Sequence, residues 1–417
     1  MDVFKRLLQF RTVSAEGPVT GAYSECIAWL DVTVNKFCPG VTTLVVTPIE
    51  NKPILVATLL GEDPSLESVV LNAHYDVVPA MEDLWTVDPW AAGESEDGKI
   101  YGRGTQDMKI VLAQYIIALS NLVKSGKKCL RTVHMTFVPD EEIGGKDGMG
   151  EFIKQGHFKS LLGEVGVVLD EGLANEDAGK YTVFYGERCP LWVLVESKGP
   201  TGHGSRFIPN TAVEKLIGVA NKAFEKRREQ EILLGRAGGC KHCEALKLGD
   251  VLTINLTALK AGVTADGGKT FSINVIPTDA LAGFDIRVPV TTPVSEVTAM
   301  LDEWTKEEGL SWRFDPNTGE YQDLGHQVSS VDAQKCKWWA SFSNTCSNLN
   351  LDLKTEIFPA GTDSRFVRQL NIPAFGFSPM TGTPILLHEH DEYVERKVFL
   401  QGIPIYEALI YSLANVN

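Results

Sequence analysis

The chain has 417 residues, 44% of them hydrophobic and 22% charged, which is close to the globular average and argues against a disordered or fibrous protein. A single hydrophobic core stops growing at about 250–300 residues, so we expect two domains. The sequence holds 39 Lys and Arg against 54 Asp and Glu, and its formal net charge is −15. Because binding to nucleic acids and to anionic membranes depends on clustered cations, this balance argues against both partners.

We expect no targeting segment in this sequence. Phe4, Leu7 and Leu8 are spaced like one face of a short helix, and no apolar run reaches the length of a signal-peptide core or a membrane span. The eight cysteines are scattered, unlike those of a small secreted scaffold, so we expect a cytoplasmic protein. Cys240 and Cys243 flank His242 like half of a zinc site, but no second pair completes it, and a plain loop with two thiols is the favoured interpretation.

The first half alternates strand-like and helix-like patterns. Strands are expected at 68–76, 132–138 and 166–172, with a long helix from Met108 to Gly126 and another near 147–162. The long helix has apolar residues at i, i+3, i+4 and i+7, and Gly126 is suited to follow its last turn. Such alternation predicts an α/β fold with a mostly parallel sheet covered by helices on both faces.

The pattern changes near Arg188. Strands are expected at 190–200, 251–262, 272–289 and 310–316, with helices near 210–230 and 294–308. This β-α-β-β-α-β order is ferredoxin-like and makes a small α+β domain by itself. Alternation resumes after about residue 325. We therefore expect a discontinuous domain, 1–187 and 323–417, with the ferredoxin-like domain 188–322 inserted in it.

Histidine and carboxylate residues follow the predicted parallel strands, where ligands of open α/β sheets bind. One strand ends in His74 and Asp76, the next runs into Glu141 and Glu142, and a third runs into Glu171. Asp107 stands at the start of the long helix, and His388 lies near the C-terminus. Each alone has an ordinary explanation: Asp107 as a helix-capping acid, the glutamates as solvated surface charges. Together they are the ligand types that zinc accepts.

Seven motifs occur in an order that resembles the co-catalytic zinc aminoacylase/carboxypeptidase superfamily, a zinc-exopeptidase-like fold. They are HYDVVP (74–79), DPW (88–90), GKIYGRGTQDMK (98–109), PDEEIGG (139–145), LDEG (169–172), GPTGHGSRF (199–207) and HEHDEY (388–393). Within it, TVFYGER, FDIRV, AGTDSRF and LLHEHDEYV look most like the aminoacylase-1 group. The resemblance covers essentially the whole chain, including the insertion.

The resemblance implies two Zn²⁺ per subunit, which Co²⁺ or Mn²⁺ can replace. Asp107 matches the bridging carboxylate of the family. One ion would take His74 and Glu171, and the other Glu142 and His388. Five oxygen-rich ligands leave open positions for water, as a catalytic site requires.

Three further residues have catalytic roles by the same resemblance. Asp76, two residues beyond His74, would orient its imidazole, and Glu141 would be the general base. His203, in a glycine-flanked loop, would stabilise the oxyanion; an ordinary loop histidine is its alternative. In relatives this histidine reaches the neighbouring subunit's site, so the resemblance implies a homodimer formed through the inserted domain.

The substrate would be an acyl-amino acid with a free carboxylate, which suits a guanidinium. Arg365 matches the family's carboxylate-binding arginine, and Gly361 and Thr362 would add donors. Asn274 would contact the acyl or carbonyl oxygen, or be an ordinary asparagine at a strand edge. Arg287 is expected to pair structurally within the inserted domain.

Three functions compete. The favoured one is zinc-dependent hydrolysis of N-acyl-L-amino acids to a carboxylate and a free L-amino acid. A dipeptidase or carboxypeptidase of the same superfamily would need a group for the substrate's free amine, and none is identified. A non-catalytic binding protein would have lost ligands or base, whereas here the full set is present.

Overall fold

The computed structural model describes residues 1–236, 246–316 and 327–416. The chain divides into two compact units. Unit 1 comprises residues 1–186, 327–356 and 362–417, and unit 2 comprises residues 187–326 and 357–361. The domain boundary expected at 322/323 and the Cys240–His242–Cys243 group fall outside the described residues, and the expected domain limits stay predictions. None of the described helices is long and apolar enough to cross a membrane.

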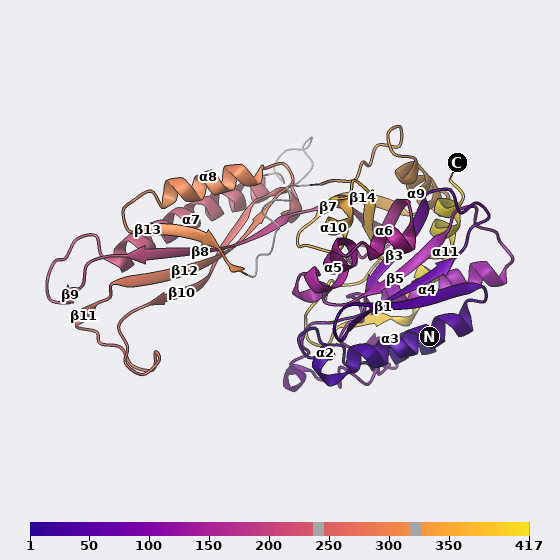
Figure 1. Cartoon of the computed structure of the whole chain (residues 1–417), viewed down its shortest axis with the longest axis horizontal. Coiled ribbons are helices and arrows are strands. Elements are labelled where there is room, and N and C mark those ends of the chain that lie inside the picture. The colour runs from indigo at the N-terminus through magenta and orange to yellow at the C-terminus, as the bar shows by residue number, and fades with distance from the viewer. Residues whose placement is uncertain (237–245, 317–326, 417) are drawn as a thin grey trace. The chain divides into compact units, whose positions relative to one another are not determined.

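Unit 1 is built on an eight-stranded sheet of order β1-β2-β5-β3-β6-β15-β7-β14 (Figure 1). Its strands are β1 (Val41–Ile49), β2 (Lys52–Leu59), β3 (Ser68–His74), β5 (Val133–Val138), β6 (Val165–Asp170), β7 (Lys180–Glu187), β14 (Asp352–Phe358) and β15 (Ala374–Phe377). The central strands β5, β3, β6 and β15 are mutually parallel, whereas β1, β2 and β7 join the sheet antiparallel. The predicted α/β class is confirmed, and the parallel strands bring their carboxyl ends to one edge.

Both faces of this sheet are buried, which explains its continuous apolar strands. On β3, Val69, Leu71 and Ala73 belong to one hydrophobic cluster and Val70 to another, because successive side chains point to opposite faces. The first cluster includes residues of α1 (Asp2–Leu8), α3 (Ala22–Phe37), α4 (Lys109–Lys124), α9 (Lys337–Asn348) and α11 (Arg396–Ala414). The second includes residues of α5 (Glu151–Lys154), α6 (His157–Leu162) and α10 (Ser364–Arg368). The short helix α2 (Gly17–Thr20) precedes α3.

Two local predictions differ from the structure in detail. The long helix α4 begins at Lys109 and is followed, as expected, by Gly126 with φ +75°. The single helix expected near 147–162 is instead a π-helical turn (Lys146–Gly150) followed by α5 and α6. Gly148 has non-helical backbone angles, and Gly156, with φ +78°, separates α5 from α6. Glycine adopts such backbone angles readily, and the spacing of apolar residues does not reveal them.

A small antiparallel ribbon completes unit 1. It pairs β4 (Lys99–Tyr101) with β16 (Tyr393–Glu395), placing Tyr101 opposite Tyr393. Single 3₁₀ turns occur at Glu82–Leu84 and Glu141–Ile143. The ribbon is important for the site because it brings together two chain segments almost 300 residues apart in sequence.

Unit 2 has the predicted ferredoxin-like topology. Its elements are β8 (Cys189–Lys198), α7 (Ala212–Arg236), β10 (Thr253–Ala261), β12 (Asp279–Val288), α8 (Val294–Trp304) and β13 (Leu310–Phe314), with a 3₁₀ turn at Leu248–Asp250. The sheet order is β10-β12-β8-β13, with antiparallel neighbours (Figure 1). A separate pair, β9 (Gly202–His203) and β11 (Val275–Ile276), extends from this unit. A second, independent core lies between the sheet and the two helices.

Candidate metal centre

Imidazole and carboxylate groups meet at the carboxyl edge of the parallel strands in unit 1. His74 is the last residue of β3, and Glu171 follows the last residue of β6. Glu141 and Glu142 form the 3₁₀ turn that follows β5. Because neighbouring parallel strands end at the same edge, residues far apart in sequence converge there without any local motif.

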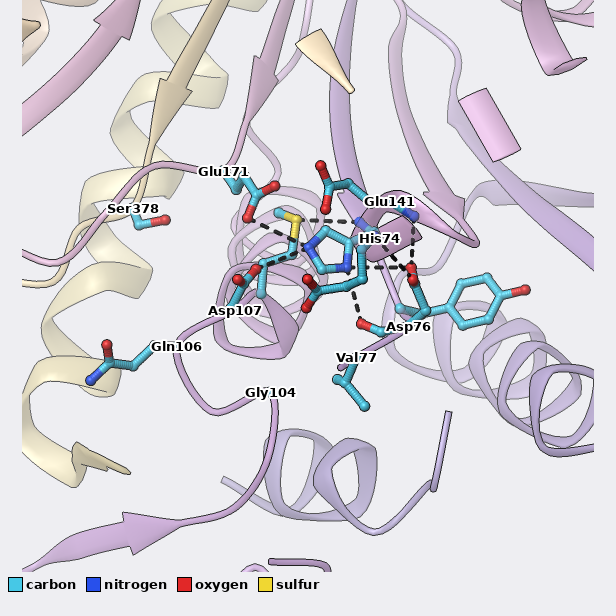
Figure 2. Close-up of polar contacts among 12 residues, drawn as sticks. His74, Asp76, Val77, Gly104, Gln106, Asp107, Glu141, Glu171 and Ser378 are labelled. Carbon is cyan, nitrogen blue, oxygen red and sulfur yellow. Dashed lines mark hydrogen bonds and ion pairs between the residues drawn. The ribbon is translucent and has the colours of Figure 1, made fainter. Parts of the chain in front are cut away.

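His74 lies at the centre of one group (Figure 2). Its Nε2 atom lies 3.0 Å from Asp107 Oδ1 and 3.5 Å from Glu171 Oε2. The ligand-type atoms of His74, Glu141 and Glu171 all lie within 4.8 Å of one another. The imidazole is 1% exposed, so this group is almost fully shielded from solvent.

His388 contacts the same carboxylate, that of Asp107. Its Nε2 atom lies 3.0 Å from Glu142 Oε2 and 3.4 Å from Asp107 Oδ2. The two oxygens of Asp107 therefore face two different histidines. The N-cap residue of α4 is Met108, one residue after Asp107, and no side chain caps the helix. The interpretation of Asp107 as a helix-capping acid is therefore wrong. The partners of Asp107 are the two imidazoles.

The closeness of these charged groups shifts their pKa values. Hydrogen bonds with Asp107 and Glu142 raise the pKa of His388 to about 10. Burial raises the pKa of Glu142 to about 7 and, with the nearby Asp107 carboxylate, raises that of Glu171 well above its ordinary range. Burial alone would lower the pKa of His74, but the carboxylates around it raise it instead. Protons on the two imidazoles thus offset part of the negative charge.

Asp76 contacts both the imidazole of His74 and the turn that carries Glu141, whereas the sequence indicates only the first contact. The nearest acceptor to His74 Nδ1 is the Asp76 backbone carbonyl at 3.0 Å, with the carboxylate Oδ1 at 3.4 Å. The carboxylate accepts hydrogen bonds from the backbone N–H of Glu141 at 3.2 Å and of Glu142 at 3.3 Å, and from Ser14 Oγ at 2.8 Å. Asp76 thus holds the turn that carries Glu141 as well as the imidazole of His74.

Glu141 is buried beside the cluster without being one of the expected ligands. Burial raises its pKa well above the usual range, with His74 opposing and Asp363 and Glu142 reinforcing the shift. Asp363 is itself 1% exposed, and burial raises its pKa also. A carboxyl group with a raised pKa can both accept and return a proton near neutral pH.

Arg365 lies on α10, close to the Glu141 turn. Its Nη1 donates to the carbonyl of Thr362 at 2.7 Å, and its Nη2 donates to the carbonyl of Gly144 at 2.7 Å. Thr362 Oγ1 accepts from the backbone N–H of Ser364. Gly361 and Thr362 precede α10, in the segment that follows β14. The guanidinium therefore links this segment to the turn after β5.

His203 and Asn274 lie together in unit 2. β9 pairs His203 with Val275, and the backbone N–H of Gly204 donates to the Asn274 carbonyl at 2.7 Å. His203 Nδ1 accepts from the backbone N–H of Ser205 at 3.2 Å, which leaves the proton of the neutral ring on Nε2. Arg287 of the same unit forms a bidentate pair with Asp285, at 2.7 and 3.1 Å, as expected.

Sequence reasoning missed three buried residues beside the centre: Arg103, Gln106 and Glu392. All three are at most 2% exposed and connect the segment before Asp107 to the segment that carries His388. Glu392 stands among several acids in HEHDEY, and no spacing separates it from its neighbours. Only the pairing of β4 with β16 reveals what it contacts.

The donor set fits divalent metal ions. Imidazole nitrogen and carboxylate oxygen are the ligand types that zinc takes, at sites with open positions. Asp107, Glu141, Glu142 and Glu171 would carry four negative charges when ionised, which two divalent cations would balance. The two oxygens of Asp107 face different imidazoles, Oδ1 that of His74 and Oδ2 that of His388.

Comparisons with known proteins show similarity over most of the chain. Residues 70–412 match the model of peptidase family M20/M25/M40. Aminoacylase-1 of Dictyostelium discoideum is 48% identical over 366 residues, covering 88% of this chain and 87% of that protein. Aminoacylase-1 of Sus scrofa is 40% identical over 420 residues, covering 100% of this chain and 95% of that protein.

Solved structures share the fold at low identity. An M20 family metallo-carboxypeptidase from Sulfolobus solfataricus superimposes with a TM-score of 0.71 at 18% identity, covering 99% of this chain and 98% of that one. Human carnosine dipeptidase 1 gives 0.67 at 16% identity, covering 99% and 96%. A dinuclear metal-binding M20 peptidase from Bacillus subtilis gives 0.65 at 14% identity, covering 100% and 98%.

Proposed function

The chain belongs to peptidase family M20/M25/M40, and on that premise we propose that it hydrolyses the amide bond of N-acyl-L-amino acids to a carboxylate and a free L-amino acid. The observation that carries the chemistry is the grouping of Glu141 with His74, Glu171 and Asp107 in a buried cluster. The full-length similarity to proteins named aminoacylase-1 carries the choice of substrate.

Two divalent ions, proposed to be Zn²⁺, would be held by five residues. His74 and Glu171 would bind one, Glu142 and His388 the other, and Asp107 would bridge them. When bound, such ions polarise the scissile carbonyl and lower the pKa of the attacking water. Asp76 keeps the His74 ring in place through its backbone carbonyl.

Glu141 is proposed as the general base. Its carboxylate takes a proton from the attacking water and returns it to the amide nitrogen as the carbon–nitrogen bond breaks, so no net proton remains on the enzyme. The Asp76 carboxylate, by accepting from the Glu141 N–H, fixes the turn from which the base acts. Burial of Glu141 supports the role because it raises the pKa of the carboxyl above its ordinary value, which makes the carboxylate a stronger proton acceptor.

His203 is proposed to stabilise the oxyanion, assisted by Asn274. Because Nδ1 faces the hydroxyl and the backbone N–H of Ser205, the ring would present Nε2–H as the donor that an oxyanion needs. We propose that this histidine serves the metal centre of a second subunit in a homodimer formed through unit 2. Arg365, with Gly361 and Thr362, would bind the substrate carboxylate.

Mixed dimers test the shared site. A His203→Ala chain and a Glu141→Gln chain are each expected to be nearly inactive. Co-refolded in equal amounts, they should recover about a quarter of wild-type activity per site, since half of the chains pair as heterodimers and each heterodimer holds one intact site. Recovery of no activity, with heterodimers present by native mass spectrometry, would contradict the shared site.

The substrate class is tested with matched amides. N-acetyl-L-leucine and glycyl-L-leucine differ by the free amine of the dipeptide. An aminoacylase should give the higher kcat/KM with the acetyl compound. A preference for glycyl-L-leucine would instead support the dipeptidase alternative.

We also propose a cytoplasmic location. The six described cysteines are buried and form no disulfide with one another, which is typical of a reducing compartment.

A further inference from the structure

A buried carboxylate joins the two segments that carry Asp107 and His388. Glu392 is 0% exposed, and its Oε1 accepts from the backbone N–H of Gln106 at 2.5 Å. Its Oε2 accepts from the backbone N–H of Gly104 at 3.0 Å. Both donors lie just before Asp107 in sequence, so Glu392 joins this segment to its own segment, which carries His388 four residues earlier.

The Gln106 side chain reinforces the connection from the opposite direction. Its Nε2 donates to the carbonyls of Pro384 at 3.0 Å and Tyr393 at 2.8 Å, and its Oε1 accepts from the N–H of Leu386 at 3.0 Å. These partners lie on both sides of His388. Figure 2 shows Gln106 immediately before Asp107 on the segment that leads into the metal centre.

Arg103 completes the set by reaching His388 itself. Its Nη1 donates to Glu392 Oε2 at 2.8 Å, and its Nη2 donates to the His388 backbone carbonyl at 3.3 Å. The side chain is almost fully buried, and its guanidinium carbon lies 5.2 Å from the centre of the Trp85 ring. We call Arg103, Gln106 and Glu392 the buried clamp.

His388 needs these contacts because no helix or strand holds its backbone in place. It lies in a turn outside the helices and strands, with φ +63°, and its side chain is 53% exposed. Fixing such a residue costs backbone conformational entropy, which other contacts must offset. His74, in contrast, is held by the β3 ladder, and Glu171 follows β6 directly.

We propose that the buried clamp positions His388 against Asp107 and thereby sets the metal affinity of the Glu142–His388 side of the centre, while the His74–Glu171 side depends on the sheet. The inference rests on the proposed dinuclear centre. It assigns Glu392, Arg103 and Gln106 as positioning residues, none of which has to touch a metal ion or substrate.

Metal titration of the chelator-treated full chain tests the clamp. Zn²⁺ binding is measured by calorimetry, and Co²⁺ binding by its visible absorption, which reports the ligand geometry of each site. Wild-type protein should show two binding events, and His388→Ala should lose one of them. Glu392→Gln, which keeps the side-chain size but cannot accept from all its donors, should weaken that same event about 10- to 100-fold. The other event should stay within about 3-fold of wild type.

Two further variants make the result specific. Glu395→Gln, three residues along the chain, removes a carboxylate that forms an ion pair with the neighbouring Lys397 at 2.6 Å, and it should leave both events unchanged. Arg103→Lys keeps a cation for Glu392 but cannot also reach the His388 carbonyl, and it should weaken the same event about 10-fold. This variant decides the question if Glu392→Gln does not fold.

The outcomes separate the two proposals. Two wild-type events with both events unchanged in Glu392→Gln and Arg103→Lys would overturn the clamp alone. Equal weakening of both events would also overturn it, because a merely structural role predicts no selectivity. Fewer than two events in the wild-type chain would overturn the dinuclear centre, and the clamp with it.

Discussion

His74 and His388 contact the same carboxylate, yet the two are held by different kinds of structure. His74 ends a central strand, opposite Val138 of β5, and is 1% exposed. His388 lies in a turn, is half-exposed, and depends on side chains from a distant segment. A ligand on a strand is positioned by the sheet register, whereas a ligand on a loop needs dedicated polar contacts. Substitutions on the His74 side and on the His388 side of the centre should therefore have different effects on stability.

The largest expected effect belongs to Glu141, the proposed general base, which lies beside His74 and Glu171. Glu141→Gln removes the proposed base but keeps the size of the side chain, so hydrolysis should fall about 10³- to 10⁴-fold. Metal content should stay normal because Glu141 is not a proposed ligand. Rates on an N-acetyl-L-amino acid and zinc content are measured on the same sample. Normal zinc with unreduced hydrolysis would rule out this base.

Removing each histidine tests the comparison directly. In metal-free protein, His74→Ala should cost about 3–5 kcal/mol of unfolding free energy, because it removes the buried cation that the carboxylates of Asp107 and Glu171 share. His388→Ala should cost less than about 1 kcal/mol, since its ring is half-exposed. Urea unfolding gives both values. Equal costs would show that the sheet does not distinguish the two halves.

A second buried histidine, His134, is not a proposed ligand and so shows the effect of burial without metal binding. His134 lies on β5, beside β3, and is 4% exposed; Thr58 Oγ1 lies 2.9 Å from its Nδ1. Burial lowers its pKa to about 4, from an ordinary value of 6.5, so the unfolded chain binds the proton more readily than the folded one. Stability should thus fall as the pH drops from about 6.5 to 4, by up to about 3 kcal/mol from this residue.

The measurement is the difference in unfolding free energy between wild type and His134→Gln across that pH range. The wild type should lose more stability on acidification than the variant. Parallel curves would show that His134 is not buried in its neutral form. No such loss is expected on raising the pH from 7 to 8, since the ring is neutral in both states there.

A more local effect concerns the turn after β5. Gly145 has φ +61°, and a Cβ there would lie 2.3 Å from Asp363 Oδ1 and 2.9 Å from the Phe366 ring. Gly145→Ala should cost about 2 kcal/mol or more. Gly156→Ala is the matched control: its φ is +78° with no atom within 4 Å of the new Cβ, so only about 1 kcal/mol is expected. Thermal unfolding compares the two; equal shifts would contradict the close contact.

The sequence predicts the strand-held half of the site better than the loop-held half. His74, Glu141 and Glu171 follow apolar strands, and the rule that parallel strands end at one edge is enough to predict that they meet. His388 is identified through resemblance alone. Glu392, Gln106 and Arg103 cannot be recognised from the sequence because their roles arise from the pairing of β4 with β16, a contact between distant segments that no local periodicity encodes.

Local chemistry also limits the prediction of individual contacts. The spacing of His74 and Asp76 indicates an interaction, but not that the backbone carbonyl is the nearer acceptor or that the carboxylate holds the Glu141 turn. The helix expected near 147–162 fails at glycines whose backbone angles break it. The ferredoxin-like order of unit 2 is predictable because each element carries its own apolar pattern.

The central claim is that this chain is a dinuclear amidohydrolase, and metal-restored hydrolysis tests it most directly. The protein is stripped with a chelator, Zn²⁺ is added in known equivalents, and hydrolysis of N-acetyl-L-leucine is followed at each point. The account predicts no activity without metal and a plateau at two equivalents per chain. Full hydrolysis by the demetallated protein, or a plateau at one equivalent, would contradict it.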